Sequence, residues 1–145
     1  MPRHSAFSGA KIALICEGEL LVYKRDEKPG IPFPGMWDLP GGGREGNETP
    51  AECAIREAFE EFGLAIEPAT IIWERWFPSN RPDGLPTVFL VAELPAGALA
   101  GIVFGGEGER WEVMPVARFL AAADAVAQLR QRLADYLACE REPRS

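Results

Sequence analysis

The sequence predicts one α/β domain, and three observations support this expectation. A chain of 145 residues has the length of a single domain, and 47% of its residues are hydrophobic, which is enough for a sizeable core. One segment in the first half carries both helix-start and helix-stop signals. Short runs rich in Ile, Val, Leu and aromatic residues flank this segment, and a second helical pattern closes the chain. Such an arrangement fits a layered α/β architecture.

The chain is expected to begin with a loose tail over residues 1–9 and a β-hairpin. The apolar runs at 11–16 and 20–25 are separated by a short Glu-Gly-Glu segment, which is a hairpin signal. Residues 29–46 are rich in proline and glycine, and a short strand at 36–40 leads into consecutive glycines. A glycine run allows the backbone to approach a ligand closely, although a flexible turn is the simpler interpretation.

The central helix follows this glycine run. Thr49 is a good N-cap and forms a capping box with Glu52, Pro50 suits the first helical position, and Gly63 supplies the stop. Apolar residues at helical spacing predict that one stripe of the helix packs on the sheet: Ala51, Ile55, Ala58, Phe59 and Phe62.

The second half of the chain reads as strands followed by helices. Strands are expected at 69–77 and 87–94, and a short strand at 111–115 follows a glycine-rich loop. A helical segment at 116–120 precedes a long helix at 122–139, and residues 140–145 are expected to form a charged tail. The long helix carries a core stripe formed by Val126, Leu129, Leu133 and Leu137.

The central helix also carries three carboxylates within about one turn, Glu57, Glu60 and Glu61. They repel one another and lie near the C-terminal end of the helix, where the dipole favours cations. A solvated charged face is the usual explanation of such a run. The alternative is a bound divalent cation, and all-oxygen ligation suits Mg²⁺ or Mn²⁺ better than zinc. The spacing alone leaves both interpretations open.

The stretch from residue 42 to residue 64 resembles the Nudix box, the signature of the MutT/Nudix family of pyrophosphohydrolases. Ala58 is smaller than the aliphatic residue usual in the family. The fixed positions that match are Gly42, Glu48, Arg56, Glu57, Glu60, Glu61, Gly63 and Leu64. The resemblance favours the metal interpretation. It also implies the Nudix fold, a mixed β-sheet sandwiched between helices, for a single domain covering residues 1–145.

The resemblance also implies a metal site. The expected ligands of Mg²⁺ or Mn²⁺ are Glu57, Glu60, Glu61, the Gly41 carbonyl and Glu107, the last of which lies in the glycine-rich loop. Glu57 or Glu107 would act as the general base. Arg56 and Glu48 would orient the carboxylates through charge-assisted hydrogen bonds.

Two further residues are candidates for substrate binding. By resemblance, Arg25 would meet a substrate phosphate, although a polar strand end is the commoner role for such a residue. Trp37 would stack on a base, although a Trp in so apolar a stretch is more often part of the core.

The expected reaction is the Mg²⁺-dependent cleavage of a nucleoside diphosphate linked to another group (NDP-X or a (d)NTP), giving a nucleoside monophosphate and a phosphorylated product. One alternative is a non-catalytic nucleotide-sensing module, but such modules usually lose box carboxylates that this chain keeps. The other is an enzyme like isoprenoid diphosphate isomerase, which would need a second cluster of His and Glu. The chain has one histidine, His4.

Charge and composition narrow the range of partners. The net charge of −7 argues against long nucleic acid as a partner, while a small polyphosphate can bind if metal ions bridge the like charges. The three cysteines have neither disulfide-framework nor zinc spacing. The longest apolar runs are too short for a secretory signal or a membrane span, so a cytoplasmic protein with no membrane partner is expected. A homodimer is left open.

Overall fold

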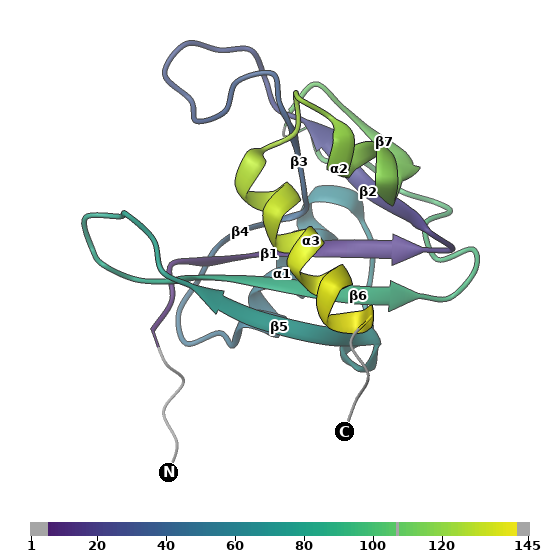
Figure 1. Ribbon diagram of the computed structural model, residues 1–145, viewed down its shortest axis with the longest axis horizontal. Helices are drawn as coiled ribbons and strands as arrows, with labels where there is room; N and C mark the ends of the chain where they lie inside the picture. Colours follow the sequence, from purple (N-terminus) through teal and green to yellow (C-terminus); the bar gives the residue numbers. More distant parts are fainter. Residues whose placement is uncertain (1–5, 107, 142–145) are drawn as a thin grey trace.

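The computed structural model describes residues 6–106 and 108–141 and shows a seven-stranded sheet with helices on both faces (Figure 1). One face is covered by α1 (Pro50–Phe62), and the other by α2 (Val116–Ala121) and α3 (Ala127–Arg141). A short 3₁₀ turn, η1 (Pro68–Thr70), follows α1. The predicted sandwich of a mixed sheet between helices is confirmed.

The sheet is mixed because β1 runs parallel to β6, whereas the other paired strands are antiparallel. Its order is β3-β2-β1-β6-β5, with β4 added to β1 and β7 added to β2. The strands are β1 (Gly9–Cys16), β2 (Glu19–Lys24), β3 (Trp37–Asp38), β4 (Gly41–Gly43), β5 (Ile71–Phe77), β6 (Thr87–Leu94) and β7 (Arg110–Pro115). The expected hairpin is present, and its turn residues Glu17 and Gly18 both have positive φ, as a tight hairpin turn requires.

The consecutive glycines form a strand, so the flexible turn, the simpler of the two interpretations, is not observed. β4 pairs with the first residues of β1, in the register Gly9 to Gly43 and Lys11 to Gly41. Gly41 has a φ of 141°, and a Cβ at this position would collide with the Ala10 carbonyl oxygen. The glycines therefore allow two backbones and a helix to meet at very short range.

Both ends of α1 are as predicted. The Thr49 hydroxyl accepts a hydrogen bond from the Glu52 amide at 3.1 Å, and the Glu52 carboxylate accepts one from the Thr49 amide at 2.8 Å. Gly63 closes the helix in the left-handed conformation with a φ of 67°. The capping residues act within one turn at each end of the helix, so the sequence alone is enough to predict them.

The buried face of α1 differs from the predicted stripe. Phe59 is 61% exposed, whereas Glu61 is only 4% exposed. The small side chains of Cys53, Ala54 and Ala58 are fully buried against the sheet. They let the helix approach β4 closely, which turns Phe59 outward and Glu61 inward. The prediction that Phe59 packs on the sheet is wrong for this reason.

The C-terminal helix begins later than predicted. Residues 122–126 form a turn that the backbone of Trp37 fixes, because the Trp37 amide donates to the Asp124 carbonyl and its carbonyl accepts from the Val126 amide. α3 then runs from Ala127 to Arg141, and the predicted stripe packs as expected at Val126, Leu129 and Leu133. Glu140 belongs to this helix rather than to a tail.

The N-terminal tail is also shorter than expected. Phe7 is 2% exposed and packs edge-on against Trp76, with the guanidinium of Arg44 over its ring. The Ser8 amide donates to the Pro86 carbonyl, and β1 begins at Gly9. Residues 7–9 are therefore part of the folded domain, and Ser8 and Gly9 form one border of the site described below.

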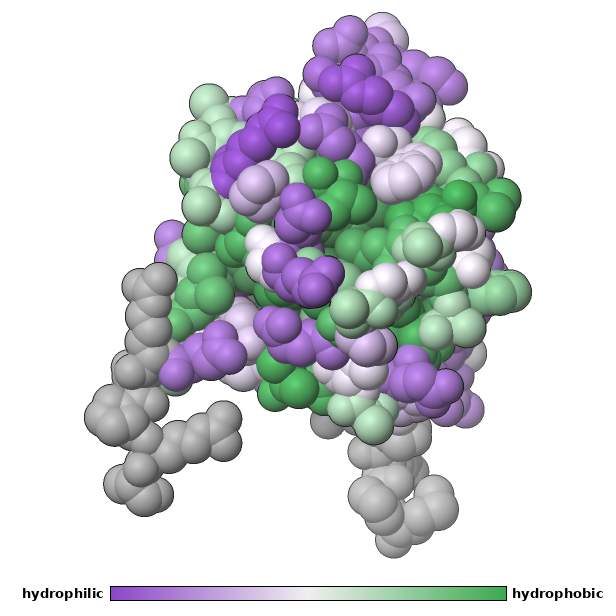
Figure 2. Space-filling view, turned by 90° about the vertical axis from the view of Figure 1, so that its right-hand side faces the viewer, coloured by the Kyte–Doolittle hydropathy of each residue, from purple (hydrophilic) through white to green (hydrophobic). Residues whose placement is uncertain are grey.

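The surface carries few large apolar side chains. The face in Figure 2 is a mixture of hydrophilic and hydrophobic residues. Among the described residues, the exposed large hydrophobic side chains are Phe33, Phe59, Ile72, Val103 and Trp111. Scattered exposure of this kind is ordinary for a folded domain. No helix within 6–106 and 108–141 is both long and apolar enough to cross a bilayer.

Candidate active site

The glycine strand β4 receives two carboxylates of α1. The Gly41 amide donates to Oε1 of Glu61 at 3.1 Å, in a buried hydrogen bond. A Cβ on Gly42 would lie only 2.6 Å from the carboxyl carbon of Glu57, so no larger residue fits there without moving Glu57. Glu57 and Glu61 lie one helical turn apart. They therefore lie beside two consecutive residues of β4, Gly42 and Gly41.

Arg56 links the remaining acidic residues of this region. Its Nε and Nη2 contact the two oxygens of Glu48 at 2.6 and 3.1 Å, a bidentate pair. Its Nη1 contacts Glu57 at 3.0 Å and Glu60 at 3.0 Å, and Nη2 donates to the Gly43 carbonyl at 2.8 Å. The hydrogen bonds from Arg56 hold the pKa of Glu48 below its usual value, and those carboxylates raise the pKa of Arg56.

The donor chemistry of this region fits a hard divalent cation. Carboxylates and backbone carbonyls are the ligands that Mg²⁺ takes, and Mg²⁺ often uses only one or two carboxylates together with water and substrate phosphate. Glu57 and Glu61 supply two carboxylates beside β4. Within the described part of the chain, no three His, Cys, Asp or Glu side chains lie close enough to hold a metal.

The structure gives a reason why the expected three-carboxylate set is not assembled. Arg56 draws the Glu60 carboxylate to itself, and the 54% exposure of that side chain leaves it room to rotate. Glu107, the expected distant ligand, lies outside the described residues.

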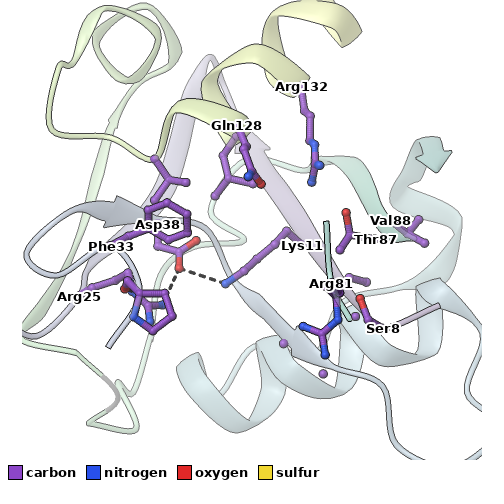
Figure 3. A pocket seen from close by; sticks show the side chains of 17 residues that line it. Ser8, Lys11, Arg25, Phe33, Asp38, Arg81, Thr87, Val88, Gln128 and Arg132 are labelled. Atoms are coloured by element: carbon purple, nitrogen blue, oxygen red, sulfur yellow. Dashed lines mark hydrogen bonds and ion pairs between the residues drawn. The ribbon is translucent and has the colours of Figure 1, made fainter. Parts of the chain in front are cut away.

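A cleft of about 330 Å³ lies beside β4 (Figure 3). Its borders are the first residues of β1 and β6, the β4 glycines, the loops at 26–36 and 78–86, and the start of α3. Four basic side chains reach it, although the chain as a whole is acidic: Lys11, Arg25, Arg81 and Arg132. Such a cleft attracts an anionic ligand.

One end of the cleft is organised by Asp38, which is 3% exposed. Its Oδ2 accepts from Lys11 Nζ at 3.1 Å, from Arg25 Nη1 at 2.9 Å and from the Tyr23 hydroxyl at 3.1 Å. Burial, together with the negative charges of Asp38 and Glu61, raises the pKa of Tyr23, so its hydroxyl stays a donor. Two cations against one carboxylate leave this end of the cleft with a net positive charge.

The two substrate-binding candidates have different positions. Arg25 lines the cleft and also a second cavity of about 300 Å³ bordered by Tyr23 and Gly108. Trp37 is 5% exposed, packs in the core on the α3 side, and has Lys24 and Arg110 over its ring. Its ring does not line the cleft, so stacking of Trp37 on a base is not supported.

Sequence reasoning missed most of the cleft. Lys11 is a single cation in an otherwise apolar strand, and Asp38 is a single carboxylate between Trp37 and Leu39. Each is a weak signal that points to a buried polar network. Phe33, 43% exposed and with a positive φ of 52°, also lines the cleft. Nothing in the sequence places Arg81 or Arg132 beside these residues.

The fold and the site together define the class: an α/β/α sandwich in which an acidic, Nudix-type helix packs on a glycine strand. The family model of the NUDIX domain matches residues 8–136. The chain belongs to the NUDIX domain family.

Solved structures share the fold. The MutT protein from Methanosarcina mazei Go1 is 20% identical, with a TM-score of 0.73 over 98% of this chain and 99% of that one. A bifunctional NMN adenylyltransferase/ADP ribose pyrophosphatase from Francisella tularensis, complexed with AMP and a Mn ion, is 19% identical. Its TM-score is 0.69 over 97% of this chain and 43% of that one. At this level of identity the likeness concerns the fold.

Curated relatives have higher identity over shorter stretches. An RNA pyrophosphohydrolase from Gluconacetobacter diazotrophicus is 35% identical over 98 residues, which is 66% of this chain and 53% of the relative. A putative 8-oxo-dGTP diphosphatase 3 from Mycobacterium tuberculosis is 54% identical over 33 residues, 23% of this chain and 15% of the relative. The chain therefore spans about half the length of the first of these relatives and less of the second.

Proposed function

We propose that this chain is a divalent-metal-dependent pyrophosphohydrolase that cleaves a nucleoside diphosphate linked to another group and releases a nucleoside monophosphate. The observation that carries the proposal is the packing of Glu57 and Glu61 against β4, whose Gly42 and Gly43 also border the cationic cleft. The names of the relatives, a pyrophosphohydrolase and a diphosphatase, support the same reaction class.

The acidic residues of α1 have separate roles in this proposal. Glu57 and Glu61 would hold Mg²⁺ or Mn²⁺ together with the Gly41 carbonyl, and Glu60 would join them by rotating away from Arg56. When bound, the metal neutralises phosphate oxygens and lowers the pKa of a water molecule. Arg56 and Glu48 fix the orientation of the carboxylates. Glu57, or Glu107 beyond the described residues, takes the proton of the attacking water.

The substrate lies across the cleft. Lys11 and Arg25 bind phosphate oxygens, because Asp38 fixes both cations at the cleft and leaves them a net positive charge. The nucleoside occupies the 330 Å³ cavity, with Phe33 at its rim as the exposed aromatic surface. A bulky residue at positive φ is unusual, and such strain is concentrated at ligand sites.

A small nucleotide suits this cleft better than a long RNA. The chain carries a net charge of −7, and long nucleic acids need an extended basic face. The relative named RNA pyrophosphohydrolase makes a 5′-triphosphorylated RNA the natural comparison substrate. We expect slower turnover of that RNA than of a mononucleotide.

The test is hydrolysis of a panel of nucleoside triphosphates, nucleoside diphosphate sugars and dinucleoside polyphosphates, with Mg²⁺ or Mn²⁺. At least one substrate should yield a nucleoside monophosphate, and EDTA should stop the reaction. Lack of turnover of every member, at high enzyme concentration and with either metal, would favour a nucleotide-sensing module instead.

The variant Glu61→Gln separates chemistry from stability. Its amide oxygen can still accept from the Gly41 amide, so the metal-free melting temperature should match that of the wild type. Turnover should fall by about two orders of magnitude or more, because one charged ligand leaves the metal shell. Mg²⁺ should raise the melting temperature of the wild type more than that of the variant.

Glu67→Gln is the matched control, because Glu67 is exposed on the loop after α1 and should change neither quantity. Near-normal turnover of Glu61→Gln would remove Glu61 from the metal site.

A further inference from the structure

The loop at residues 26–35 is closed at its base and extends away from the sheet. The Gly35 amide donates to the Asp26 carbonyl at 3.1 Å, and the Arg25 amide donates to the Met36 carbonyl at 2.9 Å. In Figure 1 the loop projects beyond β3. Prolines recur within it and fix φ at their positions. Loops whose ends meet in this way form compact units, so this one can move as one body about its base.

One side chain holds the far part of this loop. Nε of Arg25 donates to the Pro32 carbonyl at 2.7 Å. Among the residues that the structure describes, the other hydrogen bonds and ion pairs of the loop stay within the stretch 25–36. The position of the loop relative to the rest of the domain therefore depends on the side chain of Arg25.

The loop has space on both sides. Pro32 and Phe33 border the cleft of about 330 Å³, whereas Asp26 and Ile31 border the second cavity of about 300 Å³. A segment with few contacts to neighbouring elements opens at a low cost in free energy. The loop can therefore shift toward the cleft without any repacking of the core.

Arg25 links this loop to the charged end of the cleft. Its Nη1 donates to Asp38 at 2.9 Å, and its guanidinium borders the cleft as well. Figure 3 shows Arg25 and Phe33 together at the Asp38 end of the cleft. A guanidinium is a planar fork, so an anion that fixes it from the cleft also fixes the Pro32 carbonyl bound to its Nε. Anion binding and loop position are thereby coupled, and such coupling acts in both directions.

Phe33 is the side chain that the loop brings to the cleft. It is 43% exposed and has a φ of 52°, a conformation that a bulky residue rarely adopts. Exposure of an aromatic ring and strain in the backbone both cost free energy, and burial of the ring against a flat ligand would offset that cost. A nucleoside offers such a flat surface and a phosphate does not.

We propose that the 26–35 loop is a lid over the cleft, and that Arg25 is the positioning residue that couples its closure to phosphate. A phosphate group held by Arg25 fixes the Pro32 carbonyl and brings the neighbouring Phe33 ring onto the nucleoside. A nucleoside without phosphate leaves the lid open. The inference rests on the proposed function to the extent that it places a nucleotide in the cleft.

The test is hydrogen–deuterium exchange of the backbone amides in residues 25–36, measured with Mg²⁺ and a saturating probe. The probes are α,β-methylene-ADP, which resists cleavage between its phosphates, inorganic pyrophosphate, and adenosine. The two phosphate probes should each slow exchange in this stretch by about fivefold or more, and adenosine should not.

Arg25→Lys separates anion binding from closure of the lid. Lysine keeps the charge but lacks the fork, so calorimetry should still detect pyrophosphate binding, whereas pyrophosphate should no longer slow exchange in residues 25–36. Arg118→Lys makes the same change at an exposed site on α2 and should behave as the wild type. A structural role alone would raise exchange in the free Arg25→Lys variant and leave the slowing by pyrophosphate intact.

Phe33→Leu tests the aromatic cover. It should weaken binding of α,β-methylene-ADP by about tenfold, as the loss of a stacking ring does, and leave the affinity for pyrophosphate unchanged. Phe59→Leu removes an exposed ring from α1 and should change neither affinity. An equal loss of affinity for both probes in Phe33→Leu would contradict the closure of this ring onto a nucleoside.

Other outcomes would also overturn the inference. These are pyrophosphate binding without slower exchange in the lid, slower exchange with adenosine alone, and a full effect of pyrophosphate in Arg25→Lys. Absence of binding by both phosphate probes would overturn it as well. Slower exchange in the lid without hydrolysis of any substrate would reject the proposed reaction alone, and hydrolysis without slower exchange would reject this inference alone.

Discussion

At the scale of single residues, the contact between Arg56 and Glu48 has the strongest geometry. Both side chains are largely buried, at 19% and 17% exposure, and they meet through two hydrogen bonds. Glu48→Gln should lower the free energy of unfolding by about 1–3 kcal/mol at pH 7, measured by urea denaturation in EDTA. Glu60→Gln, which loses an exposed pair with the same arginine, should lower it by less than about 0.5 kcal/mol.

The same pair gives a pH dependence with a defined sign. Hydrogen bonds from Arg56 place the folded-state pKa of Glu48 below its ordinary value of 4.5. The stabilisation is therefore fully present above pH 4.5 and is lost progressively as the pH falls below that value. The difference in unfolding free energy between wild type and Glu48→Gln should shrink over that range. A difference that stays constant down to pH 3 would contradict this assignment.

The residues of α1 could be predicted because their positions relative to one another are fixed by helical spacing. Glu57 and Glu61 lie one turn apart in any helix, and Arg56 reaches Glu60 for the same reason. The burial of Glu61 could not be predicted, because it depends on the distance between α1 and a strand of glycines. Lys11 and Asp38 are 27 residues apart and meet only through strand pairing.

At the scale of elements, β4 connects the fold to the site, and two glycine substitutions separate these roles. Gly42→Ala would place a Cβ 2.6 Å from the end of the Glu57 side chain, which can move. We expect a melting temperature near that of the wild type and a turnover lower by about a hundredfold, as displaced catalytic groups typically give.

Gly41→Ala is the contrasting variant. Its φ of 141° disfavours any side chain, and the new Cβ would collide with the backbone of Ala10 in β1, which cannot move aside cheaply. The free energy of unfolding should fall by about 2–4 kcal/mol in a denaturant titration. If Gly42→Ala unfolded instead and Gly41→Ala folded normally, the described packing of β4 would be wrong.

At the scale of elements, the sequence predicts which helices and turns exist better than it predicts where they begin and how they pack. The caps of α1 and the hairpin turn are local, so their residues predict them directly. The start of α3 is set by the backbone of Trp37, 90 positions before residue 127, and the helical spacing of Val126 and Leu129 carries no sign of that contact. The rotation of α1 that exposes Phe59 has a similar cause, since the closeness of β4 decides it.

At the scale of the whole molecule, Asp38 joins three strands. It lies on β3 and binds Lys11 of β1 and Tyr23 of β2, so one carboxylate ties together segments distant in sequence. Asp38→Asn should lower the free energy of unfolding by about 2–4 kcal/mol, because it leaves Lys11 and Arg25 without their anion.

A double substitution tests that explanation. Adding Lys11→Met to Asp38→Asn should recover part of the loss, because one unpaired cation is removed, and urea denaturation of the single and double variants measures this coupling. Strictly additive losses would mean that the ion pair between Asp38 and Lys11 does not account for the stabilisation.

The two helices that border the site belong to opposite faces of the sheet and to separate core clusters, α1 to one and α3 to the other. This separation has a consequence for how the protein changes over evolution. Mutations in α3 can alter which ligand fits without repacking the side chains that support the carboxylates of α1. A randomised library confined to the cleft-facing positions 128 and 132 should therefore yield many folded variants with new preferences, whereas a library of the same size in α1 should yield mostly inactive ones.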